Sequence, residues 1–287
     1  MLATIALEKF DTGLRLAFHR AKSYQPAVSF SLKAGPYTVK TVSNYEELVR
    51  CLRLRFEVFH LEYMQKNRVT GVDIDGLDMK CDHLAIFHGE RVVGTYRMNS
   101  SRFTDRFYSS GEFEMDALLA LPGAKLELGR ACIAREHRDG RVIAALWRGI
   151  SEYLRLTDTR YMFGCTSVKT VDVDEIAGVH RLLLAEGAVD TSLGVVPTRK
   201  HRVRDFATVV HDQALSTGEA SDAASATASA AATAASDLIP SLLMSYLKMN
   251  AKVCGEPALD REFGCFDYLT LLDIEQMPAA YRARYQL

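Results

Sequence analysis

The chain has 287 residues, of which 48% are hydrophobic and 25% are charged, and its net charge is −1. This length allows one large domain or a domain with an appendage, and the balanced charge argues against a dedicated nucleic-acid-binding protein. The six cysteines form no C-x-x-C pair, which disfavours zinc and redox sites and predicts free thiols in a reducing cytoplasm. No segment approaches the roughly 18 apolar residues of a membrane-spanning helix.

Residues 1–34 are predicted to be an N-terminal appendage to one α/β domain over residues 35–287. Apolar residues recur through the appendage at helical spacing, between basic ones, and include Leu7, Phe10 and Leu14. Packing against the core is the simpler interpretation of this amphipathic pattern. Peripheral docking on a membrane, such as the inner membrane, is the alternative.

Four elements are predicted before residue 100: a strand over 37–42, a helix over 43–64, an acidic loop over 66–82 and a hairpin over 83–98. The helix is expected to begin at an S-x-x-E capping box made of Ser43 and Glu46. The hairpin is indicated by two apolar runs that meet at Gly89-Glu90.

Residues 126–166 are the most informative part of the chain. They predict a strand over 125–134, a basic loop, a helix over 141–156 and a strand over 160–168. The loop carries Gly140 just before the helix, and free N–H groups at a helix N-terminus favour an anion. It is not a P-loop, because no G-K-[ST] follows, and it lacks the G-x-G-x-x-G of a dinucleotide fold.

The C-terminal part is predicted to contain a helix over 174–186, a helix over 239–249, a strand over 265–272 and a short final helix. Between the first two lies an Ala/Ser/Thr-rich insertion at about 214–237, which has no bulky apolar residue to build a core. The element order predicts a mixed α/β fold with a central sheet flanked by helices.

Candidates for catalysis lie on two of the predicted strands. Glu127 could take a proton from an attacking amine, because an α-amino group with a pKa of about 8 is mostly protonated at neutral pH. Arg130 follows on the same strand, and Gly129 between them indicates a bulge or a close ligand approach. A structural ion pair of Glu127 with an arginine is the alternative. His83, at the start of the hairpin, is a further candidate for catalysis or for a structural hydrogen bond.

The acidic loop raises the question of a metal site. It carries four aspartates, at positions 73, 75, 78 and 82. A calcium loop would need a later glycine than Gly76 and a final glutamate, so no metal is expected. A cationic substrate is the better partner, and a solvated acidic turn is the alternative.

Seven segments together resemble the GNAT superfamily, and within it the ornithine-lipid-forming N-acyltransferases: LRFEVF (54–59), CDHL (81–84), VGTYR (93–97), FYSSGEF (107–113), ELGRAC (127–132), LWRGI (146–150) and FGCTS (163–167). The chain is also similar to acyl-homoserine lactone synthases. The resemblance implies a GNAT-like fold and transfer of a fatty, or 3-hydroxy fatty, acyl group to the amino group of an amino acid such as ornithine or glycine. Acyl-phosphopantetheine on acyl carrier protein is then the co-substrate, acyl-CoA is the alternative donor, and no permanently bound cofactor is expected.

The resemblance also assigns binding residues. The acceptor amino acid is expected to contact Arg55, Phe59, Asp75, Asp78 and Arg97. The acyl donor is expected to contact Cys132, Ile133, Arg138, Gly140 and Arg141, with backbone N–H groups near Cys132 and Ile133 binding the developing oxyanion.

The phosphate-binding signature of acetyl-CoA users, [QR]-x-x-G-x-[GA], is kept here only at Gly140, because His137 and Val142 fill its ends. This departure favours acyl carrier protein over CoA. Three alternatives remain: a signal synthase that uses S-adenosylmethionine, a membrane-active hemolysin, and a carrier-protein-binding regulator without activity.

Overall fold

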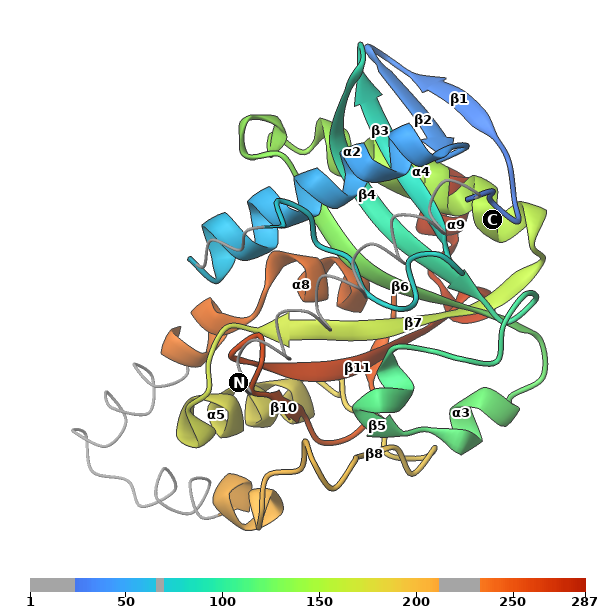
Figure 1. Cartoon of the computed structure of the whole chain (residues 1–287). Helices are drawn as coiled ribbons and strands as arrows, with labels where there is room; N and C mark the ends of the chain where they lie inside the picture. Colours follow the sequence, from blue (N-terminus) through green and yellow to red (C-terminus); the bar gives the residue numbers. More distant parts are fainter. Residues whose placement is uncertain (1–23, 66–69, 212–232) are drawn as a thin grey trace. The chain divides into compact units, whose positions relative to one another are not determined.

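The computed structural model describes residues 24–65, 70–211 and 233–287 (Figure 1). The chain forms two compact units, and its fold is mixed α/β with helices flanking the strands, as predicted. The first unit contains the described residues up to Asp105, Leu128–Thr159 and Tyr285–Leu287, and the second contains Arg106–Glu127 and Arg160–Arg284. The boundary between Glu127 and Leu128 falls inside one strand, β6.

The strands of the first unit lie in the order β1-β2-β3-β4-β6. Their bounds are β1 Ser31–Ala34, β2 Tyr37–Thr41, β3 Asp82–His88, β4 Arg91–Ser100 and β6 Ala124–Ile133. Strands β1 to β4 pair antiparallel. The predicted hairpin is confirmed, and Gly89 takes the positive φ of 61° that its tight turn requires.

Part of the predicted appendage belongs to this sheet. Strand β1 pairs with β2, and the N–H groups of Ala27 and Val28 donate to the carboxylate of Asp82 at 2.7 and 3.1 Å. Residues 1–23, with their amphipathic pattern, lie outside the described residues.

The predicted helix over 43–64 is present but changes geometry along its length. Helix α2 spans Tyr45–Arg55 and continues as the π-helix η1, Phe56–Tyr63. The predicted capping box is wrong by one position. Asn44 is the N-cap, its side chain accepts from the N–H of Glu47, and the Glu47 carboxylate accepts from the N–H of Ser43. Both Ser and Asn are good N-caps, so the local sequence does not distinguish them.

Helix α4, Arg141–Leu156, packs closely on the sheet of the first unit. A Cβ added at Gly149 would lie 2.6 Å from Leu84 Cδ1 and 2.7 Å from Val39 Cγ1, so glycine lets the helix approach. A Cβ at Gly94 of β4 would likewise lie 2.7 Å from Val142 Cγ1. Leu84 and Gly94 therefore face α4.

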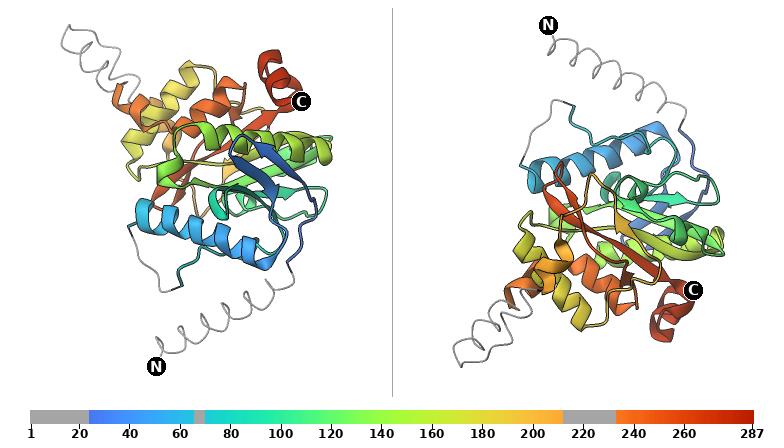
Figure 2. Two further views of the ribbon diagram at one scale, coloured as in Figure 1. Left: turned by 90° about the horizontal axis from the view of Figure 1, so that it is seen from above. Right: turned by 90° about the horizontal axis from the view of Figure 1, so that it is seen from below.

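Helix α2 covers the opposite face of this sheet, as both views show (Figures 1 and 2). Side chains alternate between the faces of a strand, so Thr95, next to Gly94, faces α2. Its side chain is hydrogen-bonded to Cys51 of α2. His83 and Arg97, which are paired across β3 and β4, lie on this α2 face.

In the second unit, strands β7 Thr159–Val168, β11 Cys265–Asp273 and β10 Ala258–Asp260 are consecutive neighbours, and β9 Lys252–Val253 also pairs with β11. A separate pair joins β5 Phe113–Glu114 to β8 Val196–Pro197. The helices are α3 Asp116–Ala120, α5 Val173–Ala185, α8 Ser241–Lys248 and α9 Ala279–Tyr285. Single 3-10 turns occur at η2 Ser109–Gly111, η3 Arg135–His137 (in the first unit) and η4 Ile274–Gln276.

Side chains on the two faces of strand β11 pack in two different apolar clusters. Phe266 and Tyr268 pack in a cluster with residues of α5 and α8, whereas Leu269 and Leu271 pack in one with residues of α3 and β5. The predicted strands and helices of this part are confirmed within two residues. Most of the predicted insertion, residues 214–232, lies outside the described residues; residues 233–238 are helical, and Ala235 is buried.

No helix among the described residues is both long and apolar enough to cross a membrane.

Candidate functional site

A buried cluster of arginines and aspartates lies on the α2 face of the first unit. Arg55, the last residue of α2, donates from Nη1 to Asp78 Oδ1 at 2.6 Å and from Nε to Asp73 Oδ2 at 2.8 Å. Arg97 of β4 donates to Asp78 Oδ1 at 3.2 Å. The helix, the acidic loop and the strand are thus joined by charge-assisted hydrogen bonds.

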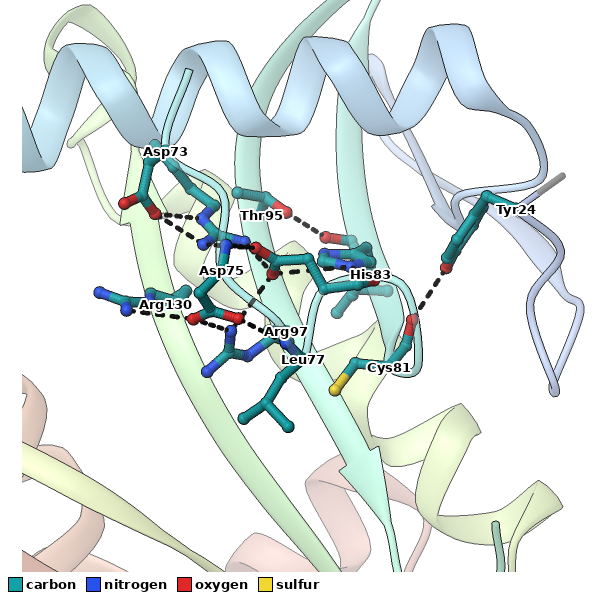
Figure 3. A network of polar contacts seen from close by, with 12 residues as sticks. Tyr24, Asp73, Asp75, Leu77, Cys81, His83, Thr95, Arg97 and Arg130 are labelled. Carbon is teal, nitrogen blue, oxygen red and sulfur yellow. Dashed lines mark hydrogen bonds and ion pairs between the residues drawn. The ribbon is translucent and has the colours of Figure 1, made fainter. Parts of the chain in front are cut away.

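Asp75 connects this buried cluster to β6. Its Oδ2 accepts from Arg97 Nη1 at 2.6 Å and from Arg130 Nη2 at 3.2 Å, and both arginines reach toward it (Figure 3). The side chains of Asp75 and Arg130 are 28% and 14% exposed, whereas those of Asp78 and Arg55 are 0% and 1% exposed. Asp75 and Arg130 are therefore the members that solvent or a ligand reaches more easily.

The cluster keeps its aspartates ionised. Burial alone would raise the pKa of Asp78, but the charges of Arg55 and Arg97 outweigh it and hold that pKa well below the ordinary value. The pKa values of Asp73 and Asp75 are also lowered, against their burial, by Arg55 and Arg97 respectively and by Arg130 in both cases. Moving a charged group out of water costs free energy, and only close pairing with an opposite charge offsets this cost.

Two buried histidines adjoin the cluster. His83 Nε2 lies 2.9 Å from the carbonyl oxygen of Asp78, and burial lowers the pKa of His83 to about 4. His60 of η1 lies with Nε2 3.1 Å from Asp73 Oδ1. No sequence pattern marks His60 as a site residue, and Asp73 is predicted only as a member of the acidic loop. Phe59, expected at the acceptor, is half-buried in the same π-helix.

The fourth aspartate of the acidic loop has a different role. Asp82 begins β3 and accepts from the hydroxyl of Tyr153 at 2.8 Å as well as from the N–H groups of Ala27 and Val28. Burial raises its pKa. Asp82 thus holds the N-terminal segment and α4 and is not part of the cluster.

The backbone is strained where Arg130 lies. Its φ is 53°, in the left-handed region that non-glycine residues rarely adopt. This break in extended geometry lies one residue after Gly129, where the sequence indicates a bulge. Strained residues held within an ordered element often mark functional sites.

Glu127 is a buried member of the second unit. Its carboxylate accepts from the N–H of Tyr108 at 2.9 Å and from the N–H of Ser109 at 2.7 Å, both at the start of η2. These two bonds fix the carboxylate on the Tyr108–Ser109 backbone.

Three of the residues expected to contact the acyl donor, Arg138, Gly140 and Arg141, lie at or near the start of α4. Gly140 is its N-cap, with a φ of 87°. Arg138 donates from Nε to the carbonyl oxygen of Ile133 at 2.9 Å and pairs with Glu62 of η1 at 2.9 Å. Arg138 therefore ties the end of β6 to η1.

The helix N-terminus already holds a carboxylate. Asp139 accepts from the backbone N–H of Arg141 at 3.1 Å and from its Nε at 2.8 Å. These bonds, led by that of the Arg141 side chain, lower the pKa of Asp139. An incoming phosphate would compete with this carboxylate for the same donors.

The cysteines are held as thiols. Burial raises the pKa of Cys132 and, together with Glu112 and Asp267, that of Cys165, so neither is poised as a nucleophilic thiolate.

A second acidic cluster is buried in the second unit. Glu112 is hydrogen-bonded to Asp267, and burial and that neighbour raise the pKa of Glu112 to about 8. Ligand atoms of Asp260, Cys265 and Asp267 lie within 4.8 Å of one another, a grouping that could hold a metal ion. Asp267 is however bonded to Ser167 Oγ, and Asp260 accepts from two N–H groups of the β10–β11 turn.

Similarity to known proteins agrees with the resemblance in the sequence. Residues 54–148 match the family described as Acetyltransferase (GNAT) domain. An L-ornithine N(alpha)-acyltransferase of Brucella abortus is 27% identical over 88% of this chain and 90% of its own. The enzyme of the same name from Rhizobium meliloti is 30% identical over 74% of this chain and 70% of its own.

Among solved structures, a CoA-dependent acyl-homoserine lactone synthase, BjaI, is 16% identical with a TM-score of 0.44, covering 85% of this chain and 84% of that one. The similarity to the Brucella abortus enzyme covers 88% of this chain and therefore extends beyond residues 54–148 at both ends. The chain belongs to the family of the L-ornithine N(alpha)-acyltransferases, which are acyltransferases.

Proposed function

We propose that this protein transfers a fatty acyl group from acyl carrier protein to the α-amino group of ornithine, with glycine as the alternative acceptor. The observation that carries the proposal is the partly open Asp75–Arg130 pair at the edge of the buried cluster. An amino acid presents an ammonium group and a carboxylate, and this pair offers the complementary charges.

The members of the cluster then divide by exposure. Asp75 binds the ammonium group of the acceptor, and Arg130 binds its carboxylate. Arg55, Asp78 and Arg97 hold these two in place, because their charged groups are buried and paired with one another. Phe59, half-buried on η1, contributes an apolar surface to the acceptor.

Amide formation needs proton removal as well as binding. The acceptor nitrogen attacks the thioester carbonyl carbon, the C–N bond forms, the C–S bond breaks, and the nitrogen loses two protons in all. One proton goes to the departing thiolate and one leaves for solvent. Glu127 is the proposed base, and backbone N–H groups near Cys132 and Ile133 are proposed to bind the developing oxyanion.

The donor is proposed to be acyl carrier protein for an electrostatic reason. CoA carries a diphosphate and a ribose phosphate, whereas a carrier protein presents only one phosphodiester at the end of phosphopantetheine. The Asp139 carboxylate at the start of α4 repels additional negative charge. Arg138, Gly140 and Arg141 remain the proposed contacts for the single phosphate.

The test is a reconstituted reaction. The purified chain is mixed with fatty acyl carrier protein or the matching acyl-CoA and with single amino acids, and N-acyl products are identified by mass spectrometry. We expect N-acylornithine, formed faster from the carrier protein. Glu127→Gln should lower turnover by about 10²-fold or more. Glu114→Gln, at an exposed position of β5, is the matched control and should keep wild-type turnover.

Three results would contradict parts of this proposal. No acylated amino acid with either donor would reject the function itself. Faster transfer from acyl-CoA would reject the donor. Full activity of Glu127→Gln would remove Glu127 from the chemistry.

A further inference from the structure

His60 has a buried nitrogen that no described residue satisfies. The residue is 2% exposed, and its Nε2 lies 3.1 Å from Asp73 Oδ1. Its Nδ1 has no hydrogen-bond partner within the described part of the chain. A buried polar atom without a partner is uncommon in folded proteins and calls for a physical reason.

The contact with Asp73 determines which nitrogen carries the proton. The charges of Arg55 and Arg130 keep the carboxylate of Asp73 ionised although it is buried. An ionised carboxylate only accepts hydrogen bonds. In the neutral imidazole, Nε2 therefore carries the hydrogen and Nδ1 keeps its lone pair. His60 is thus oriented through one nitrogen and has a proton-accepting atom at the other.

This carboxylate–imidazole pair has the layout of a general base. A carboxylate on one imidazole nitrogen fixes the tautomer and stabilises the imidazolium that forms when the other nitrogen takes a proton. Asp73 is itself held at 2.6 Å by Arg55 Nη2. Phe56 stacks on the ring of His60, with centroids 5.2 Å apart, and limits its rotation.

The local backbone is also unusual. His60 lies in the π-helix η1, where Met64 N–H bonds to the carbonyl oxygen of Phe59, five residues earlier. Such π-helical turns are rare and often occur at functional sites. The extra residue per turn changes the direction of the side chains that follow Arg55.

We propose that His60 Nδ1 accepts a proton from the ammonium group of the acceptor amino acid. This role rests on the proposed function. It generates the neutral amine that attacks the thioester: the N–H bond breaks, its electron pair stays on nitrogen, and the proton moves to Nδ1. The imidazolium then returns that proton to the departing thiolate, and the second proton from nitrogen leaves for solvent.

His83 is a poorer candidate for the same role. Its Nδ1 is likewise without a partner among the described residues, but its Nε2 is bonded to a neutral backbone carbonyl at 2.9 Å, and the carboxylate of Asp78 lies farther away, at 3.9 Å. A carbonyl stabilises an imidazolium less than a carboxylate does, and burial lowers the pKa of His83 to about 4. The charged groups around His60 are Asp73 directly, with Arg55 and Arg130 acting on Asp73.

The decisive measurement is the pH dependence of kcat/KM for ornithine, with acyl carrier protein as donor, from pH 6 to 10. His60→Gln should lower kcat/KM by about 10²-fold at pH 7. The loss should shrink toward high pH, because the acceptor then loses its own proton at a pKa of about 8. His180→Gln, which removes a buried histidine beside Tyr268 in the second unit, should show no such pH-dependent loss.

A loss for His60→Gln of equal size at every pH would overturn the proposal, because a structural defect acts in that way. Wild-type kinetics in His60→Gln would also overturn it. Both results differ from failure of the proposed function, in which the wild-type protein itself transfers no acyl group and the role of His60 falls with it.

Imidazole-labelled NMR of the wild-type protein decides the matter if His60→Gln does not fold. The His60 ring is identified by its contact with Phe56. Its Nδ1 should give the shift of an unprotonated nitrogen, and that shift should move when ornithine is added. An Nδ1 resonance that ornithine leaves unchanged would reject the proposal.

Discussion

Arg55 and Asp78 are joined by two parallel hydrogen bonds, Nη1 to Oδ1 at 2.6 Å and Nη2 to Oδ2 at 3.2 Å. The pair links the end of α2 to the acidic loop 23 residues later. Neither side chain reaches solvent, so each charge depends on the other. Because the partly exposed Asp75–Arg130 pair is held by these buried groups, the cluster couples stability to the proposed acceptor site.

Replacing Asp78 by Asn should be strongly destabilising. It leaves the guanidinium of Arg55 buried with one carboxylate fewer, and breaking a buried ion pair costs about 3–5 kcal/mol. The free energy of unfolding in urea measures this. Asp158→Asn, in the exposed Arg102–Asp158 pair, is the control and should change it by about 0.5 kcal/mol or less. Equal effects in the two variants would contradict the importance of the buried pair.

The same cluster predicts acid sensitivity. The pKa values of Asp73, Asp75 and Asp78 are lower in the folded protein than the ordinary value of 3.8. Their contribution to stability is therefore present above pH 3.8 and is lost as the pH falls through the lowered values. Thermal unfolding between pH 5 and 2 should show this loss, with a smaller slope in Asp78→Asn. Parallel curves for the two proteins would be inconsistent with it.

Glu112→Gln should stabilise the protein at alkaline pH. The pKa of Glu112 is raised from 4.5 to about 8 by burial and by Asp267, so the folded protein holds a proton that the unfolded chain releases. Wild-type stability therefore falls as the pH rises from 4.5 to about 8, at up to about 1.4 kcal/mol per pH unit. The difference in unfolding free energy, variant minus wild type, should grow over this range and then level off. Glu114→Gln is the exposed control, and a difference independent of pH would refute the shift.

Asp139→Asn should strengthen phosphate binding at the start of α4. The amide keeps an acceptor for the N–H of Arg141 but removes the negative charge, and it frees the guanidinium of Arg141 from its ion pair. Titration calorimetry with CoA should show a severalfold lower Kd. Glu152→Gln, near the other end of α4, should leave the Kd unchanged. An unaltered Kd in Asp139→Asn would place the phosphate elsewhere.

Gly149→Ala tests the close approach of α4 to the sheet. The added methyl group would lie within 3 Å of Leu84 and Val39, and overpacking costs about 1–3 kcal/mol. Better helix propensity returns at most about 1 kcal/mol. A net loss in urea unfolding is therefore expected. Gly111→Ala, where a Cβ meets nothing within 4 Å, is the control; a stabilised Gly149→Ala would show that the helix moves to accommodate the methyl.

Much of the fold follows from local patterns. The β6–α4–β7 unit, the hairpin at Gly89 and helix α5 are all predicted within two residues of their observed ends, because periodicity and turn residues act over short distances. The predicted N-cap of α2, Ser43, lies one residue before the observed one, because Ser43 and Asn44 satisfy the same local rule.

The candidate site was only partly predictable. The predicted site residues of the acidic loop and of strands β4 and β6 include Asp75, Asp78, Arg97 and Arg130, which meet in the structure. The spacing of residues in the sequence does not show how exposed each side chain is. It therefore does not distinguish the partly exposed Asp75 from the buried Asp78. The spacing also does not show that Asp82 lies outside the cluster. Asp82 instead accepts hydrogen bonds from the N–H groups of Ala27 and Val28, which lie far from it in the sequence.

The sequence by itself determined the fold class, the order of the elements and the acyltransferase family, because helical and strand periodicities and short motifs are local properties of the chain. Only the tertiary structure decided which polar groups meet: Asp73 with both Arg55 and His60, Arg97 with both Asp75 and Asp78, and Glu112 with Asp267. The physical reason is that a buried charge is stable only where folding brings a partner to hydrogen-bonding distance, and that partner can lie anywhere in the chain.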